Sequence, residues 1–210
     1  MKLKFTIDKQ YDILMAEEIN ISRKKLGWLK KQYENNYFIL EYTRDEYQKA
    51  WDKINDKFSS YIEERTGYNW YYDVYECVIS LIHPGISNWG KEPKIVRWIH
   101  ENPYTQRRIT AHELIISHYF EIYNCDFNQH KLRSGQIWAL AEIAAYALCS
   151  LDKKALKFWP WDDLGYAYQH NYPQITNLQE KLRMIFLKKN FNEYIERGIQ
   201  LVKKYPKIKP

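Results

Sequence analysis

A histidine and a glutamate stand side by side near the start of an apolar stretch in the middle of the chain. His112 and Glu113 lie in the segment 110–123, which has the apolar spacing of an amphipathic helix. An imidazole is a zinc ligand, and a neighbouring carboxylate is suited to take a proton from metal-bound water. In the motif His-Glu-x-x-His, a second histidine four residues after the first supplies the next ligand. Here that position is Ile116.

The next histidine, His118, is poorly placed to replace the missing ligand. It follows His112 by six residues, so on a regular helix it points about 120° away and lies about 9 Å further along the axis. Only a distortion such as a π-bulge would bring both rings to one ion. The alternative is that His112 is a core histidine, because Ile116 and Tyr119 share its stripe of the helix.

A lone carboxylate follows in the next apolar segment. Glu142 is the only charged residue between Ile137 and Cys149. A carboxylate in a buried helix is costly unless it is paired or bound to metal. His112 is one candidate partner. Arg133, Arg97 or a position on an exposed edge of the helix are the alternatives.

These residues need a scaffold, and the flanking sequence predicts one. Thr43 to Glu46 is a capping box, and the apolar stripe from Tyr47 to Ile62 predicts a helix whose Trp51 and Phe58 are buried on the core. Strands are expected at 71–82 and 94–99, joined as a loose hairpin. Further helices are expected at 136–150 and after each of the caps Thr176 and Asn190. The segment 8–35 is also expected to be helical, with a break at Gly27.

Composition narrows the class of protein. The 210 residues suit an α+β fold, mostly helical with a small sheet, divided as 1–70 (N-terminal helices packed on the core), 71–151 (core) and 152–210 (aromatic loop and helices) in one compact unit.

Three cysteines without a CxxC pair and no apolar leader favour a cytoplasmic protein without a membrane span. The net charge of +6 comes from interspersed charges, so the basic residues at 23–25 and 30–31 are taken as a solvated face, and we do not favour a nucleic-acid partner.

The order of the elements over 71–151 resembles the minimal core of the gluzincin metallopeptidases. The resemblance is carried by the strand pair, the helix with His112-Glu113 and the following apolar helix with its lone Glu142. It implies that His112 and Glu142 are zinc ligands and that Glu113 is the general base. It also implies that a peptide or protein lies along strand 94–99, and that Tyr166, Tyr168 or His170 stabilises the transition state.

Ile116 departs from that pattern and leaves two functions open. The protein is either a zinc-dependent peptide hydrolase whose missing ligand comes from elsewhere, with His118, His100 and His170 as options, or a metal-free inactive relative that acts by binding. A third possibility is a helical interaction module associated with nucleic acid. That would require the exposed aromatic residues to converge on one face with the positive charge. The oligomeric state does not follow from the sequence.

Overall fold

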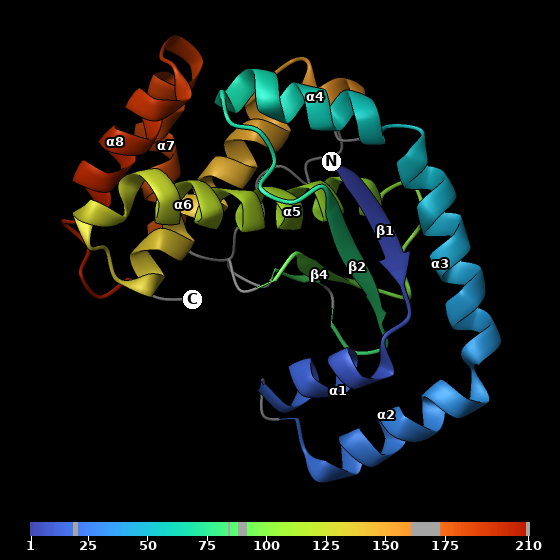
Figure 1. The fold of residues 1–210 in the computed structure, drawn as a ribbon. Coiled ribbons are helices and arrows are strands. Elements are labelled where there is room, and N and C mark those ends of the chain that lie inside the picture. The colour runs from blue at the N-terminus through green and yellow to red at the C-terminus, as the bar shows by residue number, and fades with distance from the viewer. Residues whose placement is uncertain (19–20, 84, 88–91, 161–172, 209–210) are drawn as a thin grey trace.

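The computed structural model describes residues 1–18, 21–83, 85–87, 92–160 and 173–208. It is mostly helical with one four-stranded sheet (Figure 1), which agrees with the expected α+β class. The strands are β1 (Lys2–Thr6), β2 (Val74–Ser80), β3 (Gly85–Ser87) and β4 (Lys94–Trp98). The helices are α1 (Lys9–Glu18), α2 (Arg23–Asn35), α3 (Tyr37–Asp52), α4 (Asn55–Thr66), α5 (Gln106–Ile122), α6 (Ser134–Tyr146), α7 (Pro173–Lys188) and α8 (Phe191–Val202).

The sheet has the order β1-β2-β4-β3. The first three strands in this order are parallel, and β3 pairs antiparallel with β4. The predicted hairpin between β2 and β4 is therefore wrong, because strands joined by a hairpin must be antiparallel. Strand β1 was not predicted, and its pairing with β2 ties the N-terminal segment into the sheet across the boundary placed at residue 70.

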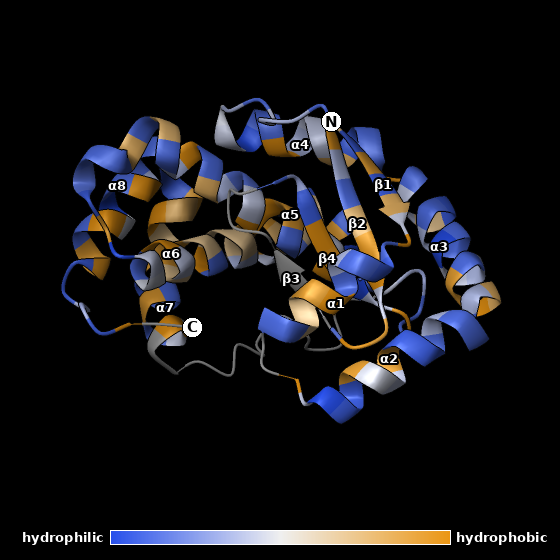
Figure 2. Ribbon diagram, turned by 60° about the horizontal axis from the view of Figure 1, so that its bottom comes forward, coloured by the Kyte–Doolittle hydropathy of each residue, from blue (hydrophilic) through white to orange (hydrophobic). Residues whose placement is uncertain are grey.

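Side chains alternate between two covered faces of the sheet. Val78 and Val96 form one small cluster with residues of α1, whereas Cys77 and Ile95 join the large core on the other side. Helices α3 and α4 contact β1, and α5 contacts β3 and β4. The sheet is thus enclosed between α1 and the layer of α3, α4 and α5, as the view in Figure 2 illustrates.

The N-terminal helices pack as expected, although their ends differ from the predictions. Trp51 and Phe58 are fully buried, which confirms the predicted core-facing stripe. The stripe belongs to two helices, because the chain turns at Ile54, and Thr43 lies inside α3 rather than capping it. Gly27 lies inside α2, so it does not mark a break.

The second half of the chain forms a helical layer around α5 and α6, which contact each other closely. Helix α5 continues into a π-helical turn at Tyr123–Phe127, and α6 continues into another at Ala147–Leu151. Helices α7 and α8 pack on α6. Asn190 caps α8 by accepting a hydrogen bond from the backbone N–H of Glu193, as predicted. Helix α7 begins before the predicted cap Thr176. None of the described helices is long and apolar enough to cross a membrane.

Candidate functional site

Helix α5 carries His112 and Glu113 in its second turn and directs them to different neighbours. Successive residues of a helix diverge by about 100°. His112 faces α6, where it meets Glu142. Glu113 faces the sheet, where its carboxylate lies against the backbone of Gly85 in β3. The two side chains therefore lie at the junction of α5, α6 and the sheet edge.

The predicted pairing of His112 with Glu142 is present. Nε2 of His112 lies 2.9 Å from Oε2 of Glu142, and both side chains are largely buried, with exposures of 19% and 13%. Oε1 of Glu142 accepts a hydrogen bond of 3.1 Å from Nε1 of Trp138. The alternative partners are engaged elsewhere, since Arg97 pairs with Glu101 and Arg133 donates to the carbonyl of Pro206.

This contact affects the pKa of the histidine. Burial by itself lowers the pKa of His112, but the hydrogen bond and the negative charge of Glu142 outweigh it. The net effect raises the pKa of His112 above its ordinary value. The negative charge of Glu142 thus favours the protonated form of His112.

Glu113 lies in a second group of charges, with Arg97 and Glu101. Burial raises its pKa to about 7, an effect that the charge of Glu142 reinforces and the charges of His112 and Arg97 oppose. A Cβ atom added at Gly85 would lie 2.9 Å from Oε1 of Glu113 and would collide with Nη1 of Arg97. Only glycine fits at this position of β3 without displacing a neighbour.

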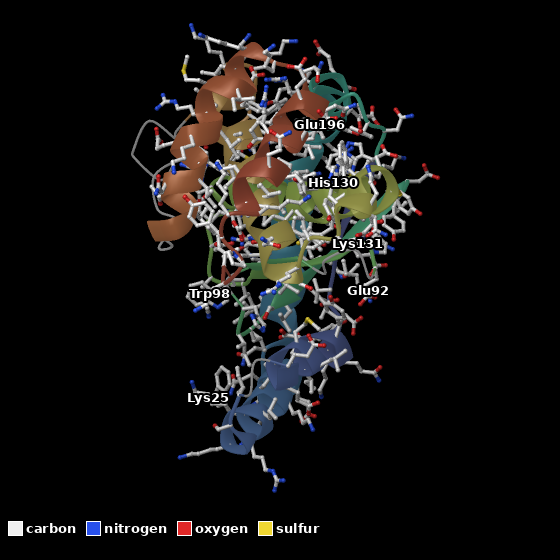
Figure 3. All side chains as sticks on the ribbon, turned by 90° about the vertical axis from the view of Figure 1, so that its left-hand side faces the viewer. Lys25, Glu92, Trp98, His130, Lys131 and Glu196 are labelled. Atoms are coloured by element: carbon white, nitrogen blue, oxygen red, sulfur yellow. The ribbon has the colours of Figure 1, made fainter. Side chains whose placement is uncertain are left out.

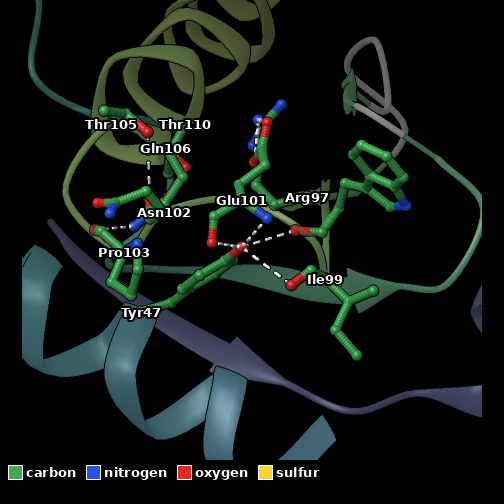
Figure 4. Close-up of polar contacts among 10 residues, drawn as sticks. Tyr47, Arg97, Ile99, Glu101, Asn102, Pro103, Thr105, Gln106 and Thr110 are labelled. Atoms are coloured by element: carbon green, nitrogen blue, oxygen red, sulfur yellow. Dashed lines mark hydrogen bonds and ion pairs between the residues drawn. The ribbon is translucent and has the colours of Figure 1, made fainter. Parts of the chain in front are cut away.

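Arg97 and Glu101 connect this group to the turn between β4 and α5. The guanidinium of Arg97 is fully buried and pairs with the carboxylate of Glu101. The hydroxyl of Tyr47 donates to the carbonyls of Trp98 and Glu101 and accepts from the backbone N–H of Glu101, as Figure 4 shows. Tyr47 of α3 thus fixes the turn from which α5 begins.

The sequence pattern by itself could identify two of these residues, Arg97 and Glu101. Arg97 lies two residues after Ile95 and so on the same buried face of β4, where a cation requires an acidic partner. Glu101, four residues later, is that partner. Gly85 gave no such signal, because its role depends on a contact with α5 that only the fold creates.

The other predicted ligand positions do not join His112. Ile116 is buried, with 2% exposure. His118 is also buried, and its ring stacks on Trp70 with centroids 4.6 Å apart. Neither of its ring nitrogens has a hydrogen-bond partner among the described residues, and burial lowers its pKa to about 4. His100 is exposed and meets Trp98 edge to face.

Tyr166, Tyr168 and His170, proposed for transition-state stabilisation, lie outside the described residues. Within the described part of the chain, no group of three or more His, Cys, Asp or Glu side chains is arranged to hold a metal ion. A catalytic zinc ion usually has three protein ligands. His112 and Glu142 supply two, so the described residues do not fit the zinc ion that the resemblance implies.

The strand expected to receive a partner has neighbours on both sides. β4 is paired with β2 on one side and, at residues 95–97, with β3 on the other, so this part of the strand has no open edge for the peptide predicted along 94–99. β3 lies at the end of the sheet, and α5 contacts it. The sheet edge nearest Glu113 therefore belongs to β3.

No family model, curated protein or solved structure matches this chain.

Proposed function

We propose that this protein is a metal-free relative of the zincin metallopeptidases that acts by binding an extended protein segment. The observation that carries the proposal is the 2.9 Å contact between His112 and Glu142. The resemblance makes these two side chains zinc ligands, yet here they satisfy each other. A reducing, cytoplasmic setting is part of the proposal and is supported by the three free cysteines, Cys77, Cys125 and Cys149.

Ile116 supports the loss of metal binding. In the zincin motif this position supplies the second histidine, and an isoleucine side chain has no atom that coordinates metal. Its 2% exposure shows that the residue contributes to the core instead. Glu142 does not need a metal ion to offset its burial, because His112 and Trp138 both contact its carboxylate.

Binding is proposed at the edge of the sheet next to this pair. β3 ends the sheet, and an extended segment can add to a sheet edge through backbone hydrogen bonds. The carboxyl of Glu113 and the guanidinium of Arg97 lie against Gly85 of the same strand. A partner segment along β3 would therefore lie close to both groups.

The metal content of the purified protein tests the first half of the proposal. The wild type should contain no stoichiometric zinc after incubation with excess ion. Ile116→His should gain one zinc per chain, and Ile116→His combined with Glu142→Ala should lose it again. Ile115→His is the matched control, since it introduces the same residue at a buried position of α5 that points about 100° away. Stoichiometric zinc in the wild type that Glu142→Ala abolishes would overturn the proposal.

Amide hydrogen exchange tests the second half. Peptides selected by display against the full-length protein should slow exchange at residues 85–87. Peptides that bind tightly and protect only other segments would show that β3 is not the binding edge.

An active zinc hydrolase is the second candidate, and Glu113 is the observation that favours it. A general base works best with a pKa near the working pH, and burial raises the pKa of Glu113 to about 7. This candidate needs a third ligand from outside the described residues, where His170 lies. Zinc binding that depends on His112, Glu142 and His170, with peptide cleavage lost in Glu113→Gln, would establish it in place of the binding protein.

A further inference from the structure

Helix α2 carries a dense, exposed positive charge. Five of its residues are basic and exposed, namely Arg23, Lys24, Lys25, Lys30 and Lys31. Within the described residues none of these five forms an ion pair, and the carboxylate of Glu34 pairs with Lys9 at 3.3 Å. Figure 3 shows Lys25 at the extremity of the molecule formed by α1 and α2, remote from α7 and α8. The charge is thus presented to solvent without compensation from α2 itself.

Three of the cations occupy the wrong end of the helix for stability. Arg23, Lys24 and Lys25 form the first turn of α2, which contains no acidic residue. The helix dipole makes the N-terminus electropositive, so cations there are unfavourable and anions are favourable. A bound phosphate would relieve this repulsion and find backbone N–H groups at the same end of the helix.

Exposed aromatic rings lie on α2 and on the first turns of α3. Trp28 lies on α2 itself and is 52% exposed. The first turns of α3, which follows α2 after a single residue, carry three more. These are Tyr37, Phe38 and Tyr42, exposed by 49%, 77% and 61%. The basic residues of α2 and the exposed rings of α3 thus follow one another along two successive helices.

We propose that the corner of α2 and α3 binds single-stranded nucleic acid. The cations would contact the phosphates, and the aromatic rings would stack on the bases, as in proteins that bind single strands without sequence preference. Helix α2 is roughly 20 Å long, which is enough to follow several nucleotides. This surface is distinct from the site at His112, so the proposal does not depend on the proposed function.

A membrane surface fits the corner less well. Helices that lie in a membrane interface turn an apolar face toward the lipid. The apolar residues Leu29 and Tyr33 of α2 are buried against the protein, and its exposed side is polar apart from Trp28. The apolar surface that α2 and the first turns of α3 expose comes mainly from aromatic rings, whose flat faces can stack on bases.

Fluorescence anisotropy with a labelled thymidine oligonucleotide of about 15 nucleotides tests the proposal. Binding should weaken as salt rises, with a log–log slope of about −3, which corresponds to about 60-fold between roughly 50 and 200 mM. Reversal of three charges (Lys24→Glu, Lys25→Glu and Lys31→Glu) should weaken binding at least about ten-fold and reduce the slope by about 2. Phe38→Ala with Tyr42→Ala should weaken binding and leave the slope unchanged, because stacking releases no counterions.

Matched controls separate this surface from general electrostatic attraction. Lys181→Glu, Lys188→Glu and Lys189→Glu place the same charge change on or directly after α7 and should leave the affinity within about two-fold. Equal weakening by both triple variants, or no binding by the wild type at low salt, would overturn the proposal. So would binding of vesicles containing phosphatidylglycerol that depends on Phe38 and Tyr42 while the oligonucleotide is ignored.

Discussion

Nε2 of His112 lies 2.9 Å from Oε2 of Glu142, thirty residues further along the chain. The contact joins α5 to α6 at the point where two adjacent residues of α5 face different partners. Of these two adjacent residues, His112 is held by the carboxylate of Glu142, and Glu113 lies beside Arg97 and Gly85. These contacts, together with the burial of His118 on the same helix, lead to four predictions.

Substitution of Glu142 should change the titration of its partner. In Glu142→Gln the negative charge that raises the pKa of His112 is lost, so the pKa of His112 should fall below its wild-type value. Loss of the charged hydrogen bond should cost about 1–2 kcal/mol of unfolding free energy. NMR titration of the histidine rings and urea denaturation measure the two effects. Glu196→Gln, at an exposed position of α8, is the control, and an unchanged His112 pKa would contradict the assigned contact.

Substitution of Glu113 should stabilise the protein at neutral pH. Because burial raises the pKa of Glu113 from 4.5 to about 7, the folded protein holds this proton between those values while the unfolded chain has released it. The contribution of Glu113 to stability is therefore full below pH 4.5 and is lost as the pH rises through 7. The difference in free energy of unfolding between Glu113→Gln and the wild type should therefore grow in favour of the variant by roughly 3 kcal/mol as the pH rises from 4.5 to about 7. Glu64→Gln, exposed on α4, should show no such increase.

His118 should produce the opposite dependence. Burial lowers its pKa from 6.5 to about 4, so between these values the unfolded chain binds a proton that the folded protein excludes. Its contribution is full above pH 6.5 and is lost as the pH falls through 4. His118→Phe keeps an aromatic ring against Trp70 and should gain roughly 3 kcal/mol relative to wild type as the pH falls across this window. Urea midpoints at several pH values measure the gain, and an equal gain in His100→Phe would rule out burial as its cause.

Addition of one methyl group at Gly85 should disturb the buried charges. In Gly85→Ala the new Cβ atom would meet Arg97 and Glu113, so the variant should lose about 1–3 kcal/mol of unfolding free energy. Gly27→Ala is the control, because the structure leaves its Cβ position open and alanine favours a helix. It should gain about 0.5–1 kcal/mol. Thermal unfolding of the two variants should therefore shift in opposite directions from the wild type.

The sequence offered the contact between α5 and α6 as one of several possible pairings. Glu142 is a lone charge in an apolar helix and needs a partner, and His112 is a polar residue on an apolar stripe with the same need. Long apolar stripes likewise identified the buried faces that carry Trp51 and Phe58. Such features depend on the residues of one segment and on the cost of leaving them unpaired.

The sheet could not be predicted in the same way. β3 has only three residues, too few for an alternating pattern. The segment Lys2–Thr6 does alternate between polar and apolar residues, with Leu3 and Phe5 buried, so this pattern could have identified β1. The direction of pairing between β2 and β4 is set by the path of the connecting chain, which no local motif specifies. The capping box at Thr43 failed for a related reason, because a short motif cannot exclude that the helix extends upstream to Tyr37.

The parallel pairing of β1 with β2 also determines when the sheet can assemble. All of α1 to α4 lies between the two strands, so β1 has no strand to pair with until that whole length of chain has been made and compacted. Contacts between distant segments are slow to form, because the closure of a long loop costs entropy before pairing compensates for it. Pairing of β1 with β2 therefore closes a loop that contains all of α1 to α4.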